Sequence, residues 1–276
     1  MAVHLQMPLR IVNSKQNSRL KELRRALRSP EWKANGLVGI EGPHLIEEAL
    51  RAGLRIRCAF AGEEFQHWLE QLTLSADTET LVIPKSILAS TFVTETPQPI
   101  AALIDPPQWT WANLLEKPNQ PALVVVLAGV QDPGNLGTIL RSAEAFGAHG
   151  VVSLPGTVSP WNQKAMRASA GSVFRLPLIP ASPDECFSRL REGGVSVLTT
   201  ALRDGTSADA VDFTRPIGLV IGNEGNGVPD EIARHADGAV TIPCPGPVES
   251  LNASVAAGVL LYEVSRQRRA APGRRK

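Results

Sequence analysis

The alternation of apolar runs with amphipathic stretches divides the chain into two α/β regions. Residues 122–128 (ALVVVLA) form an uninterrupted apolar run, which is typical of a strand buried on both faces of a parallel sheet. Residues 136–146 follow with helical spacing, and strand-like and helical stretches then alternate as far as residue 268. This pattern predicts one α/β domain with a mostly parallel sheet over residues 122–268.

The first hundred residues repeat this alternation on a smaller scale. Residues 18–27 form a basic stretch in which the leucines have helical spacing, so a helix is expected there. Strand-like segments are expected at residues 37–41, 56–61, 80–83 and 99–104. The pattern therefore predicts a small N-terminal α/β domain over residues 1–105. Residues 106–121 contain four prolines and no clear periodicity, which favours a linker.

Several helix starts carry capping signals. Ser159 precedes a proline that would occupy a first helical position, and Ser182 with Glu185 matches a capping box. Asn135 can cap the helix that follows it. Ser250 can cap the last helix, and Asn252 would then lie in its first turn.

Composition indicates a globular protein with a sizeable core, because 43% of the residues are hydrophobic and 20% are charged. No apolar run reaches the length of a membrane span, and the first residues lack the apolar segment of a secretory signal. The three cysteines are far apart and odd in number, so we expect neither a disulfide framework nor a metal site. These features favour a cytoplasmic protein without a membrane or a metal partner.

Charge is distributed unevenly. Residues 10–33 carry eight Lys/Arg against two Glu, and residues 266–276 carry six Lys/Arg and no acid. The rest of the chain is acidic. Basic ends on an acidic body indicate a polyanion partner such as RNA, although solvated termini often collect basic residues without any partner. Charge alone leaves both interpretations open, and for the tail after residue 268 a disordered segment is the alternative to a phosphate contact.

Three loops rich in glycine, proline and polar residues each follow a predicted strand. They are residues 129–137 (GVQDPGNLG), 222–229 (GNEGNGVP) and 245–252 (PGPVESLN). In open parallel sheets, ligands bind beyond the carboxyl ends of the strands, so these loops predict a single site. Neither the P-loop pattern nor GxSxG or HExxH occurs, and GNEGNG has the wrong glycine order for a dinucleotide fingerprint.

Arg141 is the candidate anion ligand of this site, because a guanidinium beside a glycine loop suits a phosphate or a carboxylate. Glu144 lies three residues further along the helix, so the alternative is a surface ion pair between the two. Glu224 lies in the second loop, where the alternative is a solvated acid. For Ser250 and Asn252, capping and turn formation are sufficient explanations.

Together the loops resemble the signature of the SpoU/TrmH family of RNA ribose 2′-O-methyltransferases in the SPOUT superfamily. The matching segments are NLGTILRSAE (residues 135–144), IGNEGNG (221–227), and IP (242–243) with SLNAS (250–254). The resemblance covers residues 122–268. The N-terminal region is more weakly similar to the RNA substrate-binding domain common in this family, at residues 13–27 and 39–49.

The resemblance implies a catalytic domain whose C-terminal segment is threaded into a trefoil knot, S-adenosylmethionine as the methyl donor, and a homodimer with the site near its interface. It also assigns residues. The donor contacts would be Thr200, Gly222, Ile242 and Leu251, and the catalytic group would be Arg141 with Asn135, Glu224, Ser250 and Asn252 around it.

The implied reaction is attack of a ribose 2′-oxygen on the donor methyl group. A guanidinium stays protonated in proteins, so Arg141 is better suited to grip a phosphate, and Glu224 is the better proton acceptor from pKa alone. The separate N-terminal domain favours large-subunit ribosomal RNA over tRNA. The alternatives are a tRNA 2′-O-methyltransferase, a non-catalytic RNA-binding protein on the same fold and, disfavoured by the glycine order, a Rossmann-type oxidoreductase.

Overall fold

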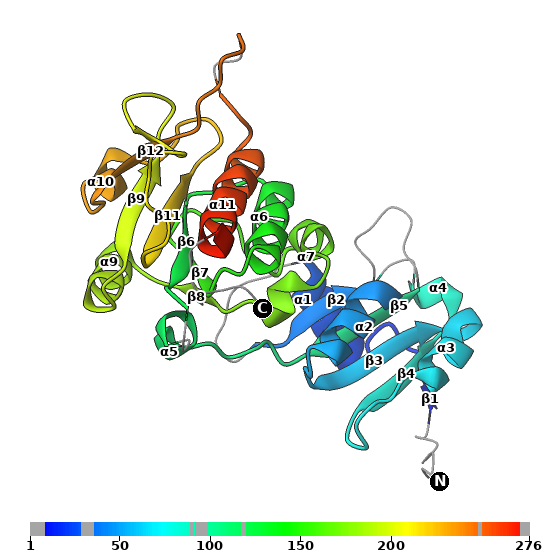
Figure 1. Ribbon diagram of the computed structural model, residues 1–276. Helices are drawn as coiled ribbons and strands as arrows, with labels where there is room; N and C mark the ends of the chain where they lie inside the picture. Colours follow the sequence, from blue (N-terminus) through cyan, green and yellow to red (C-terminus); the bar gives the residue numbers. More distant parts are fainter. Residues whose placement is uncertain are drawn as a thin grey trace. The chain divides into compact units, whose positions relative to one another are not determined.

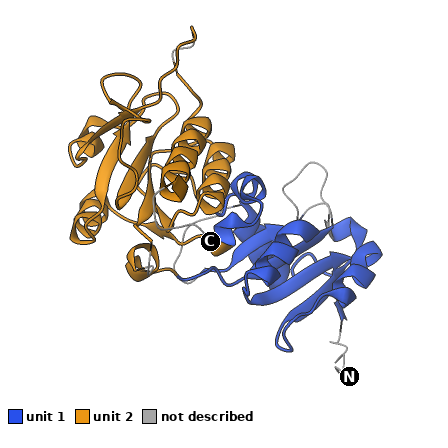
Figure 2. Cartoon of the chain, viewed as in Figure 1, with its two compact units in different colours: residues 1–108, 161–174 blue, residues 109–160, 175–276 orange. Residues whose placement is uncertain are grey.

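The computed structural model describes residues 9–28, 36–88, 91, 99–116, 120–247 and 250–270. Most of the basic tail, residues 271–276, lies outside this part of the chain. The chain forms two compact units (Figure 2). Unit 1 comprises residues 1–108 and 161–174, and unit 2 comprises residues 109–160 and 175–276. By its contacts, the segment 161–174 thus belongs with the N-terminal residues.

Unit 1 is built on a five-stranded sheet with the order β1-β4-β3-β5-β2 (Figure 1). The strands β1, β4 and β3 run parallel, whereas β5 is antiparallel to both of its neighbours. The strands are β1 (Arg10–Ile11), β2 (Val38–Glu41), β3 (Ile56–Gly62), β4 (Glu79–Ile83) and β5 (Ile100–Ile104). The helices are α1 (Ser18–Arg28), α2 (Pro43–Arg51), η1 (Glu63–Phe65), α3 (Gln66–Gln71), α4 (Lys85–Leu88), α7 (Gln163–Ser169) and α8 (Ser172–Arg175), whose last residue belongs to unit 2.

The basic helix α1 forms where the leucine spacing predicts it. Leu20, Leu23 and Leu27 are buried in the core of unit 1, so the leucines anchor the helix while its arginines and Lys21 lie on the other faces. Gly39 of β2 lies directly beneath, where an added Cβ would be only 3.1 Å from the Ala26 Cβ. The close approach of α1 to β2 therefore favours a glycine at this position.

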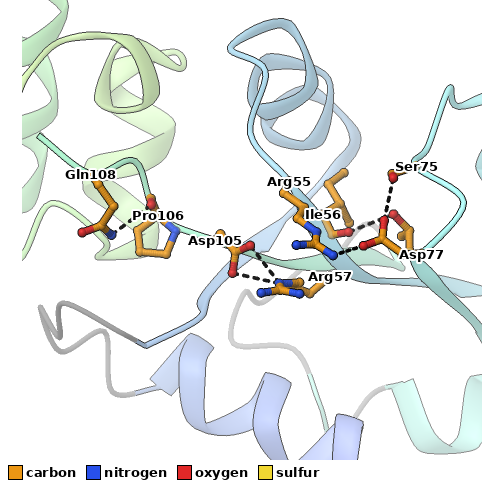
Figure 3. Close-up of polar contacts among 9 residues, drawn as sticks. Arg55, Ile56, Arg57, Ser75, Asp77, Asp105, Pro106 and Gln108 are labelled. Carbon is orange, nitrogen blue, oxygen red and sulfur yellow. Dashed lines mark hydrogen bonds and ion pairs between the residues drawn. The ribbon is translucent and has the colours of Figure 1, made fainter.

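Two ion pairs lie at one end of the unit 1 sheet (Figure 3). The Arg57 Nε lies 2.8 and 3.0 Å from the two carboxylate oxygens of Asp105, which joins β3 to the residue after β5. Arg55 pairs with Asp77, whose carboxylate also accepts a hydrogen bond from Ser75. These side chains are exposed, so the pairs contribute little to stability.

Unit 2 is built on a seven-stranded sheet in which every pair of neighbours is parallel, as the buried apolar run predicts. The order is β10-β12-β9-β11-β6-β7-β8, and every residue of β6 is buried. The strands are β6 (Leu123–Ala128), β7 (Gly150–Ser153), β8 (Leu178–Pro180), β9 (Ser196–Thr200), β10 (Thr206–Ser207), β11 (Ile217–Gly222) and β12 (Gly238–Thr241).

Helices cover both faces of this sheet. The helices of unit 2 are α5 (Trp111–Leu115), α6 (Pro133–Ala145), α9 (Pro183–Glu192), α10 (Asp230–Ala233) and α11 (Ala253–Ala270). Side chains of α5, α9 and α10 share one core with β6 and β7. The helices α6 and α11 lie side by side (Figure 1). Gly258 of α11 faces Ser142 of α6, and the Tyr262 ring meets the Phe146 ring edge-on at 5.9 Å between centroids.

Local differences from the sequence prediction concern mainly helix starts. The helix α7 begins at Gln163 behind Asn162, whose side chain accepts from the Lys164 N–H, so the cap predicted at Ser159 is wrong. The predicted cap at Ser182 is confirmed. Within the predicted linker, residues 111–115 form α5, and its Leu114 is fully buried.

The described part of the chain shows neither a membrane-spanning helix nor a group of metal ligands. None of its helices combines the length and apolar character that a membrane crossing requires. Nor do its His, Cys, Asp and Glu side chains gather in a group of three that could hold a metal ion.

Close packing at β7 gives a test of the unit 2 core. An added Cβ on Gly150 would lie 2.7 Å from both the Leu114 Cγ and the Pro177 carbonyl oxygen. We expect Gly150→Ala to lower the free energy of unfolding by about 1–3 kcal/mol through overpacking. The control is Gly218→Ala in β11, where the nearest atom would be 3.4 Å away. Equal denaturant midpoints for the two variants would contradict this account of the packing.

Candidate functional site

The three glycine-rich loops follow β6, β11 and β12. Because all strands of the sheet are parallel, the carboxyl ends of these strands lie at one edge, where such sheets bind ligands. The strands β6 and β11 are direct neighbours, with Gly222 paired to Ala128, so the first two loops begin side by side. Hydrogen bonds join all three loops.

The Glu224 carboxylate joins the second loop to the first. It accepts hydrogen bonds from the backbone N–H groups of Gln131 (3.3 Å) and Asp132 (3.2 Å), and from the Asn135 side-chain amide (2.9 Å). Partial burial raises the pKa of Glu224, but these hydrogen bonds outweigh it, so the pKa is lowered from its ordinary value. Glu224 is thus held as a carboxylate in this arrangement.

Asn252 joins the third segment to the same network. Its Nδ2 donates to the Asn135 Oδ1 at 3.1 Å, while its Oδ1 accepts from the N–H groups of Ser254 and Val255. Asn252 therefore caps α11, and the cap predicted at Ser250 is wrong. The two amides, Asn252 and Asn135, donate in series towards the Glu224 carboxylate, and only the NH₂ end of each amide can donate, so the neighbours fix the orientation of both.

The start of α6 also differs from the sequence prediction. The helix begins at Pro133 behind Asp132, whose carboxylate accepts from the Asn135 N–H at 2.8 Å. Asn135 is thus a residue of the first turn, and the cap predicted there is wrong. Its side chain is consequently available for the contacts with Glu224 and Asn252.

Sequence reasoning missed two residues that shape these loops. The Asn223 Nδ2 donates to the Gly129 carbonyl at 2.9 Å, and its Oδ1 accepts from the N–H groups of Gly225 and Asn226. The Thr157 hydroxyl, beyond β7, donates to the Leu127 carbonyl and accepts from the Gly129 N–H. Asn followed by glycines is a turn signal that could have indicated the first; nothing in the sequence singles out Thr157.

Arg141 is exposed on α6, and its guanidinium has neither a hydrogen bond nor an ion pair with the described residues. The alternative pairing with Glu144 is wrong, because Glu144 binds Arg175 instead, at 2.7 and 3.0 Å from its two carboxylate oxygens. Arg141 is therefore a cation with its donors available for a ligand.

The expected donor-binding residues also lie at this edge. Thr200 ends β9, Gly222 ends β11 and Ile242 follows β12. Within the described chain, the backbone of residues 242–247 makes no hydrogen bond, which leaves N–H and C=O groups for a ligand. A donor recognised largely through backbone groups fits such a segment. Leu251 lies just before Asn252, whereas Ser250 is exposed and has no hydrogen bond among the described residues.

The fold and this edge define an α/β protein with a candidate ligand site formed by loops, and comparisons with known proteins identify its family. The model of the SpoU rRNA methylase family matches residues 122–262, and that of the MRM3-like substrate binding domain matches residues 17–102. The chain belongs to the SpoU rRNA methylase family. This confirms the predicted class: it is an RNA ribose 2′-O-methyltransferase that uses S-adenosylmethionine.

Among its relatives is the 23S rRNA (guanosine(2553)-2′-O)-methyltransferase RlmP of Bacillus subtilis (strain 168). It is 31% identical over 257 residues, which cover 92% of this chain and 98% of the relative. The SpoU methyltransferase AviRb from Streptomyces viridochromogenes, solved in complex with AdoMet, superposes with a TM-score of 0.80 at 27% identity and covers 92% and 98% of the two chains. An AdoMet-bound rRNA methyltransferase from Sinorhizobium meliloti superposes with a TM-score of 0.80 at 28% sequence identity. The match covers 94% of this chain and 98% of that chain.

The lowered pKa of Glu224 gives a pH-dependent test. Its stabilising contribution is complete above the ordinary carboxyl pKa and is lost as pH falls through the lowered folded value. We expect Glu224→Gln to be less stable than the wild type at neutral pH, and this gap to close in acid. Urea unfolding across the pH range measures it. Glu231→Gln, at an exposed acid in the first turn of α10, is the control. A gap independent of pH would contradict a role for the charge.

Proposed function

We propose that this enzyme methylates a ribose 2′-hydroxyl in large-subunit ribosomal RNA. The observation that carries the proposal is the available Arg141 guanidinium on α6, the helix whose first turn is joined to the other loops through Asn135, Glu224 and Asn252. The named activity of the Bacillus subtilis relative, which aligns over nearly its whole length, supports ribosomal RNA over tRNA as the substrate. The basic helix α1 supplies cations for an RNA backbone within the proposed N-terminal domain, residues 1–105.

The donor would be held by the loops after β9, β11 and β12, through Thr200, Gly222, Ile242 and Leu251. When bound, S-adenosylmethionine supplies a methyl group activated by a sulfonium. Gly222 suits this place because the loop folds back tightly upon it: an added Cβ would lie 2.2 Å from the Gly227 backbone. Only a glycine permits both this fold-back and a close approach of the backbone to a ligand.

The contribution of the chain to the reaction is mainly alignment. Arg141 grips an RNA phosphate and thereby orients the ribose, since its planar fork matches two phosphate oxygens. Asn135, Glu224 and Asn252 fix the loop from which α6 begins, and with it the helix that carries Arg141. Ser250 is exposed just before the Asn252 cap and would contact the substrate. Holding the 2′-oxygen in line with the methyl group can supply much of the rate enhancement.

We infer a homodimer formed through α11. Val255, Val259 and Tyr262 lie on one face of this helix and are 51%, 40% and 48% exposed, although they are apolar or aromatic. A second copy of the chain would cover this face. Ser142, which directly follows Arg141 on α6, faces Gly258 of the same helix α11. The dimer interface would therefore lie beside the site.

The family resemblance also leads us to propose a trefoil knot in the catalytic domain, residues 122–268. The strand β12 is separated from β11 by β9, whereas α11 packs along α6 and contacts β11. The helix α11 therefore lies against α6 and against a strand two places away from β12 in the sheet, which is compatible with such a threading. The domain limits, with residues 106–121 as linker and 269–276 as basic tail, remain part of this proposal.

Cytoplasmic localisation belongs to the same proposal. Ribosomal RNA is a cytoplasmic substrate, and Cys58, Cys186 and Cys244 are free thiols, as expected in a reducing compartment.

The substrate is tested by mapping 2′-O-methylation across total RNA from cells with and without the gene. We expect one large-subunit ribosomal position to lose its methyl group. Loss of a tRNA methyl group instead would favour the tRNA alternative. An unchanged map, together with no heat of S-adenosylmethionine binding in calorimetry, would favour a non-catalytic RNA-binding protein.

Arg141→Lys tests the guanidinium fork. The change keeps the charge but removes the planar donors, so we expect most turnover to be lost while S-adenosylmethionine still binds. Methyl transfer and calorimetry measure the two effects. Arg191→Lys, at an exposed position on α9, is the matched control and should behave as the wild type. Near-normal turnover of Arg141→Lys would contradict a specific role for the Arg141 guanidinium.

Val259→Asp tests the dimer. A charge in the middle of an apolar interface should produce monomers in light scattering, because a buried unpaired carboxylate is costly. Ala270→Asp adds the same charge at the exposed end of α11 and should leave the dimer intact. A dimeric Val259→Asp variant would show that the interface lies elsewhere. A monomeric wild type would contradict the proposed dimer.

A further inference from the structure

We propose that Asn223 is a positioning residue of the methyl-transfer site. Its side chain fixes the loop that carries Glu224 to the loop that precedes α6. This inference rests on the proposed function and adds to the site a residue whose side-chain hydrogen bonds all go to backbone groups of the two loops. The argument depends on the two ends of the Asn223 amide, which make different contacts.

The acceptor end of the amide shapes the second loop from within. The Asn223 Oδ1 accepts from the N–H groups of Gly225 at 2.9 Å and Asn226 at 3.2 Å. The backbone closes the same turn, because Asn223 and Gly227 exchange hydrogen bonds of 2.8 and 2.9 Å. Gly227 has a positive φ of 69°, which favours glycine. These contacts would form a tight turn even if no other loop were nearby.

The donor end reaches out of the turn. The Asn223 Nδ2 donates to the Gly129 carbonyl at 2.9 Å, at the end of the neighbouring strand β6. The position of Gly129 is itself fixed, since its N–H donates to the Thr157 hydroxyl at 3.1 Å. The turn is thereby attached to a rigid point of the sheet edge. This contact goes beyond what a turn requires.

The attachment determines where Glu224 lies. Glu224 follows Asn223 directly, and its carboxylate must reach the N–H groups of Gln131 and Asp132 and the Asn135 amide at the same time. If the turn could move away from Gly129, these three contacts would lengthen together. The start of α6 would lose its link to the donor loop, and Arg141 would be less well placed. A displacement of about 1 Å can reduce a rate by about a hundredfold.

Asn223→Asp separates the two ends of the amide. The carboxylate keeps both acceptor contacts inside the turn, so the protein should fold and the turn should persist. The donor to Gly129 is lost, and an anion faces a carbonyl oxygen in its place. Asn226→Ala is the matched control, because the Asn226 side chain, in the same loop, has no hydrogen bond with the described residues.

Two measurements test the proposal. Hydrogen exchange of a peptide spanning residues 129–136 reports the attachment without any need for activity. We expect faster exchange in Asn223→Asp and no change in Asn226→Ala. For methyl transfer, we expect kcat of Asn223→Asp to fall by at least about tenfold, while the KM for RNA and the Kd for S-adenosylmethionine change by less than about threefold.

The pH profile provides the signature of the donor. A protonated carboxyl group can donate to Gly129, so the rate of Asn223→Asp relative to the wild type should rise only as pH falls towards the ordinary Asp pKa of about 3.9. Glu224 and Asp132, the other carboxylates of the network, are present in both proteins, and Glu224→Gln in the Asn223→Asp background separates the titration of Glu224 from that of the new carboxylate. Unchanged exchange in Asn223→Asp would overturn the proposal, whether or not the wild type methylates RNA. Equal effects of Asn223→Asp and Asn226→Ala would overturn it as well.

Discussion

The Glu224 carboxylate is the interaction on which the candidate site depends, because it joins segments that are far apart in the sequence. It accepts hydrogen bonds from two backbone N–H groups that precede or cap α6 and from the Asn135 side-chain amide. Asn135 in turn accepts a hydrogen bond from Asn252 at the start of α11. A carboxylate with three donors is strongly held, and its lowered pKa reflects this. The two helices that begin at this point therefore keep a fixed relation to the sheet edge.

The parallel sheet makes this interaction possible. Because β11 lies between β9 and β6 in parallel register, the loops after β6 and β11 start at the same level and need only short side chains to meet. Gly222 and Gly227 allow the second loop to fold back on itself, so that Glu224 points to the first loop rather than continuing the strand direction. Local backbone freedom and long-range register thus produce one network together.

The sequence was sufficient for the repeating features and insufficient for contacts between segments. Burial on both faces makes β6 a plain apolar run, and leucine spacing defines α1, so both were predictable. Asp132 and Asn135 are both good capping residues, and only the three-dimensional contact with Glu224 decides between them. The helix α5 escaped prediction because prolines on both sides indicate a linker, while Leu114 is held by tertiary packing.

The same network bears on the path of the proton. A guanidinium is not a proton acceptor in proteins, and Glu224, which the sequence favoured as acceptor, has a lowered pKa and uses its oxygens to hold three donors. A carboxylate with a lowered pKa is a weak base and gains little by taking a proton from a ribose hydroxyl. We infer that the described residues accelerate the reaction mainly by alignment. A bound S-adenosylmethionine would supply the activated methyl group, and the positive charge would leave with the 2′-OH proton to water.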